Sequence, residues 1–166
     1  MSIANVRVQS EDFDVGAEIA KLRRGNAGIG ALACFVGLVR DLNEDNENAG
    51  IAEMTLEHYP GMTEKALAEI VAEARQRWDI IDALVIHRIG TLKPTDQIVL
   101  VATVSAHRGE AFASCEFIMD YLKTRAPFWK KEQTAQGAHW VDARESDDNA
   151  MQRWEPIPAR SQRELE

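Results

Sequence analysis

The sequence has little cysteine and no long apolar run. Its two cysteines, Cys34 and Cys115, lie far apart with no CxxC spacing, which disfavours a disulfide framework, a zinc knuckle and a thioredoxin-type motif. No stretch approaches the roughly 18 apolar residues that a membrane span needs, and the first residues show no secretory signal. We therefore expect a protein of the reducing cytoplasm that does not associate with membranes.

Positive charge is also scarce, because 19 lysines and arginines stand against 27 aspartates and glutamates, for a net charge of −8. This balance argues against a general nucleic-acid binder, since phosphate contacts require Lys and Arg. The exception is the segment 123–131, which holds four basic residues and no acidic one. A basic island in an acidic protein predicts a local site for an anion.

The length of 166 residues is close to that of one domain. We expect a single domain over residues 1–154, an acidic, Asn-rich loop at 41–50, and a mobile tail at 155–166. Apolar spacing predicts two long helices, at 63–78 and at 110–123, the second with Phe112, Cys115, Met119 and Leu122 facing inward.

Strands are predicted by alternating or continuous apolar runs, with the two runs at 80–89 and 97–105 joined by a hairpin-like connection. The run at 29–39 is apolar on both alternating sets, which suits a strand covered on both faces or one that crosses between two layers, with Cys34 as a core residue. Further strands are expected at 6–8, 51–58, 128–134 and 139–143. The mixture lacks strict βαβ alternation, so the predicted class is α+β with a largely antiparallel sheet.

Residues 105–109, SAHRG, stand where a strand ends and a helix begins. Free N–H groups and the positive end of the helix dipole favour an anion there, and His107 and Arg108 add donors for phosphate or carboxylate. A capping turn with a solvated arginine explains the same residues, so both interpretations stay open.

Lys123 and Lys130 flank Pro127, one at a helix end and one in the following strand. If both amines converge on one pocket, partial desolvation gives a lysine that acts as acid, base or nucleophile. The helix dipole also favours a lysine at position 123 for structural reasons alone. Lys131 is expected to point away from Lys130.

Arg40 ends an apolar segment just before a loop, where residues often line sites but a terminal arginine is also ordinary. His87 lies within an apolar strand and is interpreted as a half-buried, hydrogen-bonded residue. The four histidines share no metal-ligand spacing, so we expect neither a metal site nor a resident cofactor.

Several stretches are much more specific than these features, and they occur in one order along the chain. They are residues 55–67 (TLEHYPGMTEKAL), 85–90 (VIHRIG) with 105–108 (SAHR), 123–132 (KTRAPFWKKE) and 140–147 (WVDARESD). Together they resemble the catalytic, large subunit of molybdopterin synthase over roughly residues 5–154.

The resemblance implies an α+β fold of the α/β-hammerhead type, with a small added β subdomain. It implies a homodimer with a small ubiquitin-like sulfur-carrier subunit at each end, which makes a heterotetramer. The implied reaction is sulfur transfer to cyclic pyranopterin monophosphate (precursor Z), giving the dithiolene of molybdopterin in molybdenum cofactor biosynthesis. Because sulfur arrives as a thiocarboxylate on the carrier's C-terminal glycine, the large subunit needs no cysteine of its own.

The resemblance also implies roles for individual residues. Lys123 and Lys130 match the two lysines regarded as catalytic, Lys123 nearest the carrier's terminal carbonyl and Lys130 stabilising charge on the substrate. Arg40, His107 and Arg108 match contacts to the substrate phosphate and pterin, some of which come from the neighbouring protomer.

Four further residues belong to the implied binding stretches with less defined roles, namely Leu38, Val39, Lys131 and Glu132. Leu38 stands where relatives often have a lysine, so one charge at the rim of the pocket is missing.

Two other functions compete with sulfur transfer. A non-catalytic scaffold would dock a ubiquitin-like tail, but such a scaffold has no need for two converging amines. An unrelated enzyme acting on organic phosphates would use Arg108 and Lys130 as a clamp and turn over without a protein sulfur donor.

Overall fold

The computed structural model describes residues 5–41, 51–134, 137–141, 149–150 and 152–154. Most of the predicted acidic loop and all of the predicted tail lie outside the described residues. The described elements are, in chain order, β1 (Asn5–Gln9), α1 (Val15–Leu22), β2 (Ala31–Leu38), β3 (Ile51–His58), α2 (Met62–Arg77), β4 (Asp82–Arg88), β5 (Gly90–Leu92), β6 (Gln97–Ser105), α3 (Arg108–Arg125), β7 (Phe128–Thr134) and β8 (Gly137–Val141).

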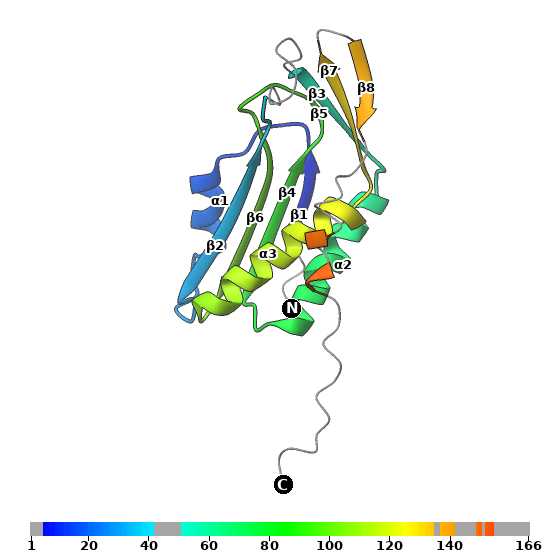
Figure 1. Cartoon of the computed structure of the whole chain (residues 1–166). Coiled ribbons are helices and arrows are strands. Elements are labelled where there is room, and N and C mark those ends of the chain that lie inside the picture. The colour runs from blue at the N-terminus through cyan, green and yellow to red at the C-terminus, as the bar shows by residue number, and fades with distance from the viewer. Residues whose placement is uncertain (1–4, 42–50, 135–136, 142–148, 151, 155–166) are drawn as a thin grey trace.

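The described strands form two four-stranded sheets (Figure 1). The larger sheet has the order β1-β4-β6-β2, with β1 parallel to β4 and the other pairs antiparallel. Helices α2 and α3 cover one of its faces and α1 lies on the other, while the smaller sheet stands beyond one end (Figure 1). The smaller sheet, β5-β3-β7-β8, is antiparallel throughout. The predicted α+β class, with two long helices and an added small β unit, is confirmed.

The connection between β4 and β6 is more than the hairpin that the sequence predicts, because it contains β5. This short strand pairs with β3 of the smaller sheet, with Leu56 opposite Gly90. Gly90 has a φ of 86°, a conformation that glycine adopts without strain. The chain thus passes from one sheet to the other here, and this ties the two sheets together beside the ends of β4 and β6.

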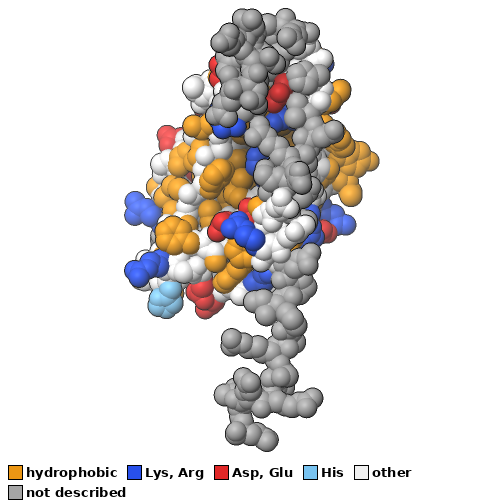
Figure 2. All heavy atoms as spheres, in the orientation of Figure 1, with side chains coloured by type: hydrophobic (Ala, Val, Ile, Leu, Met, Phe, Trp, Pro, Cys, Tyr) orange, Lys and Arg blue, Asp and Glu red, His pale blue; other side chains and the backbone are white. Residues whose placement is uncertain are grey.

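Strand β2 lies at an edge of the larger sheet, with β6 as its partner among the described strands. Cys34 and Phe35 point to opposite faces of the strand and are both exposed, so the described residues do not cover it on both faces and the prediction that Cys34 lies in the core is wrong. Phe35 and Leu38 are 44% and 53% exposed, and Phe112 of α3, predicted to face inward, is 67% exposed. Hydrophobic side chains gather on the face over β2 and α3 (Figure 2). An apolar pattern shows that side chains avoid water, but it does not show whether this chain or another covers them.

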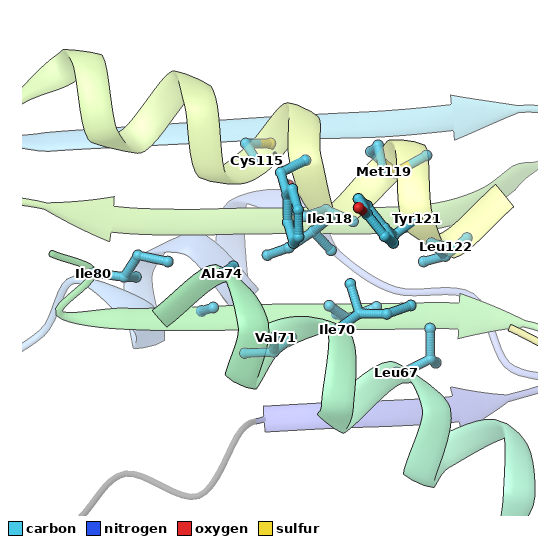
Figure 3. Close-up of a cluster of buried hydrophobic side chains, with 14 of the residues drawn as sticks. Leu67, Ile70, Val71, Ala74, Ile80, Cys115, Ile118, Met119, Tyr121 and Leu122 are labelled. Carbon is cyan, nitrogen blue, oxygen red and sulfur yellow. Dashed lines mark hydrogen bonds between the residues drawn. The ribbon is translucent and has the colours of Figure 1, made fainter. Parts of the chain in front are cut away.

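The main core lies between the larger sheet and the two long helices (Figure 3). In α3 the buried positions Ala111, Cys115, Ile118 and Leu122 repeat at helical spacing and face the sheet. Facing them, α2 contributes Leu67, Ile70, Val71 and Ala74, all almost fully buried. Among the described residues, no helix combines the length and apolar character of a membrane span. The packing fixes α3 along the sheet, and therefore fixes both of its ends.

Candidate active site

A cavity of about 640 Å³ lies where β2 ends. Its wall comes from the end of β2 and the residues after it, from β4, from the start of β6 with the loop before it, and from the last turn of α3. The lining residues are Phe35, Val36, Gly37, Leu38, Val39, Arg40, Asp41, His87, Pro94, Thr95, Ile98, Val99, Leu122 and Lys123. Four residues implied by the family resemblance, Leu38, Val39, Arg40 and Lys123, are thus brought together.

Lys123 lies in the last turn of α3 and is exposed, whereas Leu122 beside it is buried. The helix ends at Arg125 because the residue before Pro127 takes an extended conformation. The negative end of the helix dipole attracts the ammonium group. The packed helix thus places the Lys123 side chain at the cavity.

Arg40 is held in place through the backbone of its neighbour. The N–H of Val39 donates to the carbonyl of Asp96 at 2.9 Å, and the carbonyl of Val39 accepts from the N–H of Thr95 at 2.8 Å. Val39 is 4% exposed and packs against Met54, Leu56 and Leu92 of the smaller sheet. The exposed guanidinium of Arg40 therefore extends from a fixed part of the cavity wall.

Lys130 and Glu132 lie on the inner face of β7. The Lys130 ammonium is 3.4 Å from a carboxylate oxygen of Glu132, whose residue is 7% exposed. Neither lines the cavity, but Phe128, on the same face of β7, stacks on the cavity residue His87. Lys131 lies on the opposite face, as predicted, with its ammonium 5.8 Å from the ring centroid of Trp140.

His107 and Arg108 lie at the other end of α3 from Lys123. The Ser105 hydroxyl accepts a hydrogen bond from the His107 N–H at 3.0 Å, and both His107 and Arg108 are exposed. Lys123 lies fifteen helical positions after Arg108, which corresponds to about 22 Å along the axis. Within one chain the structure does not bring these two groups to the same site.

The sequence predicts that His87 is a half-buried, hydrogen-bonded residue. The structure shows that it also lines the cavity together with Lys123. It is 6% exposed, and its Nδ1 lies 2.7 Å from the carbonyl of Arg88. Burial lowers the pKa of His87 to about 4, although the bond to Arg88 opposes the shift and the charges of Lys123 and His58 add to it. Its place in the cavity wall was not predicted, because the cavity combines β4 with the end of β2 and the last turn of α3, which no local pattern specifies.

The two cysteines offer no activated thiol at this site. Cys115 is buried, and desolvation raises the pKa of its thiol to about 12. Cys34 is exposed on β2, but it is absent from the cavity lining. Nucleophilic attack by a thiolate of Cys115 is therefore disfavoured at neutral pH.

Residues 8–125 match the family model described as MoaE protein. The chain belongs to the MoaE family. It is 70% identical over 149 residues to the molybdopterin synthase catalytic subunit of Ralstonia nicotianae, a match that covers 90% of this chain and 83% of that one. The solved MoaE protein from Burkholderia ambifaria is 62% identical and superposes with a TM-score of 0.79, covering 93% of this chain and 99% of that one.

A more distant solved structure is a protein–protein complex of subunits 1 and 2 of the molybdopterin-converting factor from Helicobacter pylori. It matches at 20% identity with a TM-score of 0.64, covers 86% of this chain and 92% of that one, and shares the fold. Membership of the MoaE family confirms the identification made from the motifs. The chain is an enzyme of molybdenum cofactor biosynthesis, a molybdopterin synthase catalytic subunit.

Proposed function

We propose that this chain transfers sulfur from the C-terminal thiocarboxylate of a small ubiquitin-like subunit to cyclic pyranopterin monophosphate, forming the dithiolene of molybdopterin. The observation that carries the proposal is the cavity shared by Arg40 and Lys123. A guanidinium beside an ammonium suits an anionic phosphate and the charge that develops during transfer. A donor that brings its own sulfur also fits a cavity with no cysteine in its lining.

Lys123 is the amine assigned to the carrier's terminal carbonyl. It either polarises this carbonyl or serves as the acid and base for the transfer. Lys130 is assigned to charge on the substrate, and its ion pair with Glu132 holds it on the inner face of β7. Arg40 binds the substrate at the cavity wall, with Leu38 and Val39 beside it. Lys131 stays a weaker candidate because it lies on the other face of the strand.

His107 and Arg108 enter the site from a second copy of the chain. Strand β2 and helix α3 begin at one end of the larger sheet, where Ala31 pairs with Ser105, and both end near the cavity. A two-fold axis through the middle of both elements would place Arg108 of one copy beside the cavity of the other. The exposed Phe35, Leu38 and Phe112 support burial of this face in a dimer.

A small subunit bound to each copy completes a heterotetramer. The solved complex of subunits 1 and 2 of the molybdopterin-converting factor supports this partner, because the matched chain of that complex shares the present fold. The cytoplasm is the proposed compartment, since neither cysteine forms a disulfide in the described structure.

Reconstitution tests the proposal directly. Purified chain is mixed with thiocarboxylated small subunit and precursor Z, and the dithiolene product is measured as its fluorescent oxidised derivative. Lys123→Ala should lower the transfer rate about 100-fold or more, the range of a lost acid–base group, with an unchanged unfolding temperature. Lys21→Ala is the matched control, because Lys21 is also an exposed lysine in the last turn of a helix.

The outcomes separate the competing functions. Near-normal transfer by folded Lys123→Ala would refute the role of that amine. Binding of the small subunit without any product from the unsubstituted chain would favour the docking scaffold. Turnover of the phosphate substrate without the small subunit would favour an unrelated phosphate enzyme.

A further inference from the structure

The ring of His87 is fixed in the wall of the cavity by two contacts. It stacks on Phe128 of β7, with ring centroids 3.8 Å apart and planes 18° apart. Its Nδ1 lies 2.7 Å from the Arg88 carbonyl. The Arg88 guanidinium in turn donates to the carbonyls of Ser10 and Gln97 at 3.0–3.2 Å. A stack and a hydrogen bond on an anchored backbone leave the imidazole little freedom to turn.

These contacts also determine which ring nitrogen carries the proton. A carbonyl oxygen only accepts hydrogen bonds, so Nδ1 of His87 must be the donor. Because burial keeps the imidazole neutral, with a pKa of about 4, Nε2 carries a free lone pair at neutral pH. The described residues form no hydrogen bond with Nε2. Nε2 is therefore an available acceptor in a residue that borders the cavity.

Two neighbouring side chains, Lys123 of α3 and His58 of β3, disfavour a positive charge on His87. His58 has its own partner, because its Nε2 lies 3.5 Å from a carboxylate oxygen of Glu64. Lys123 lines the cavity together with His87. An ammonium only donates and a neutral Nε2 accepts, so the two groups are complementary.

We propose that His87 is the positioning residue of Lys123: the Lys123 side chain turns toward the ring, a contact not formed in the structure, and its ammonium donates a hydrogen bond to Nε2 that holds the amine in the cavity for transfer. The proposal rests on the role given to Lys123 in the proposed function. His87 itself touches neither the carrier nor the substrate in this assignment. Its contribution is to keep Lys123 charged and directed inward, since a hydrogen bond to the charged form favours that form.

The first test measures Lys123 without any substrate. Trace acylation of lysines followed by mass spectrometry reports the reactivity of each amine, because only the uncharged amine reacts. His87→Phe keeps an aromatic ring for the stack on Phe128 but removes the acceptor, so acylation of Lys123 should rise about tenfold relative to Lys21. His87→Gln can place an amide oxygen near the position of Nε2 and should return the ratio toward that of the unsubstituted chain.

An unchanged Lys123 to Lys21 ratio in folded His87→Phe would overturn the proposal, and so would a ratio that stays raised in His87→Gln. If His87→Phe does not fold, His87→Met, whose flexible thioether adapts to the cavity wall, carries the same expectation.

The second test uses the reconstituted complex. His87→Phe should lower kcat about tenfold with KM for precursor Z unchanged, and His87→Gln should recover most of the loss. In the Lys123→Ala background the same substitution should have no further effect on single-turnover rates, because the residue acts through Lys123. An equal loss in both backgrounds would overturn the proposal. Failure of all transfer, together with the expected acylation shift, would instead refute the proposed function and leave the His87–Lys123 contact standing.

Discussion

Burial of a neutral imidazole at His87 couples the stability of the fold to pH. Desolvation is the largest cause of the lowered pKa, the hydrogen bond to Arg88 opposes it, and the charges of Lys123 and His58 reinforce it. The ordinary pKa of 6.5 applies in the unfolded chain, whereas the folded chain takes up the proton only near pH 4. Between these values the unfolded state binds more protons, so stability falls as the pH falls through this window.

The size of the effect follows from the shift in pKa. The contribution of His87 is fully present above pH 6.5 and is lost progressively down to about pH 4, for a total of about 3 kcal/mol. Urea unfolding of the unsubstituted chain and of His87→Phe at several pH values isolates this contribution from that of other groups. The stability difference between the two proteins should shift in favour of His87→Phe as the pH is lowered. A difference that is constant from pH 7 to pH 4 would contradict the assignment.

At the scale of elements, the contact between the start of β2 and the junction of β6 with α3 positions His107 and Arg108. The Gly30 N–H donates to the Ser105 carbonyl at 3.0 Å, and a Cβ on Gly30 would lie 2.2 Å from the carbonyl oxygen of Ala106. Both oxygens belong to the backbone, so a side chain at position 30 must push the two segments apart.

Gly30→Ala should therefore destabilise the protein by about 1–3 kcal/mol, the usual cost of overpacking. Because the displaced junction carries His107 and Arg108, the KM for precursor Z should rise more than kcat falls. Gly16→Ala in α1 is the control, since its Cβ would make only an ordinary contact of 3.4 Å with an Asp14 carboxylate oxygen. Chemical unfolding and steady-state kinetics on both variants provide the measurement. An unchanged KM in Gly30→Ala would show that this junction does not bind substrate.

The elements also show what the sequence alone can predict. Strand β3 occupies 51–58 as predicted, because its apolar and polar residues alternate and a Tyr-Pro-Gly turn ends it. The three-residue β5 was missed because it is defined by pairing with β3, some 36 positions earlier in the chain, rather than by a pattern of its own. For β2 the apolar pattern was clear, but periodicity does not show which faces the rest of the chain covers.

The candidate site was predictable to a similar extent. The motifs contain His107, Arg108, Lys123 and Lys130, and the family resemblance adds Arg40. The structure places Arg40 with Lys123 in one cavity. That juxtaposition depends on the order of the strands in the larger sheet, which no local pattern specifies. The position of His87 at the same cavity could not be predicted for the same reason, because it depends on residues of β4, β7 and α3 that are far apart in the chain.

At the scale of the whole molecule, the basic residues form two groups along α3: His107 and Arg108 lie at its start, whereas Lys123 lies in its last turn with Arg40 at the cavity. Strand β2 spans about 24 Å between Ala31 and Leu38, close to the length of helix between Arg108 and Lys123. On the face formed by β2 and α3, the two elements are therefore similar in length, and Phe35 and Phe112 are exposed there. A two-fold symmetric pair of such units would form two complete sites, each with Lys123 from one copy and Arg108 from the other.

Mixing two defective variants tests this arrangement. Lys123→Ala disables the site of its own copy, whereas Arg108→Ala weakens the site of its neighbour. In a mixed dimer one site carries both substitutions and the other carries neither, so an equal mixture that exchanges subunits should recover about a quarter of the normal rate at subsaturating precursor Z. The rate should grow from near zero as subunits exchange. If Arg108 serves the cavity of its own chain, both sites of the mixed dimer are defective and the rate stays at the level of the separate variants.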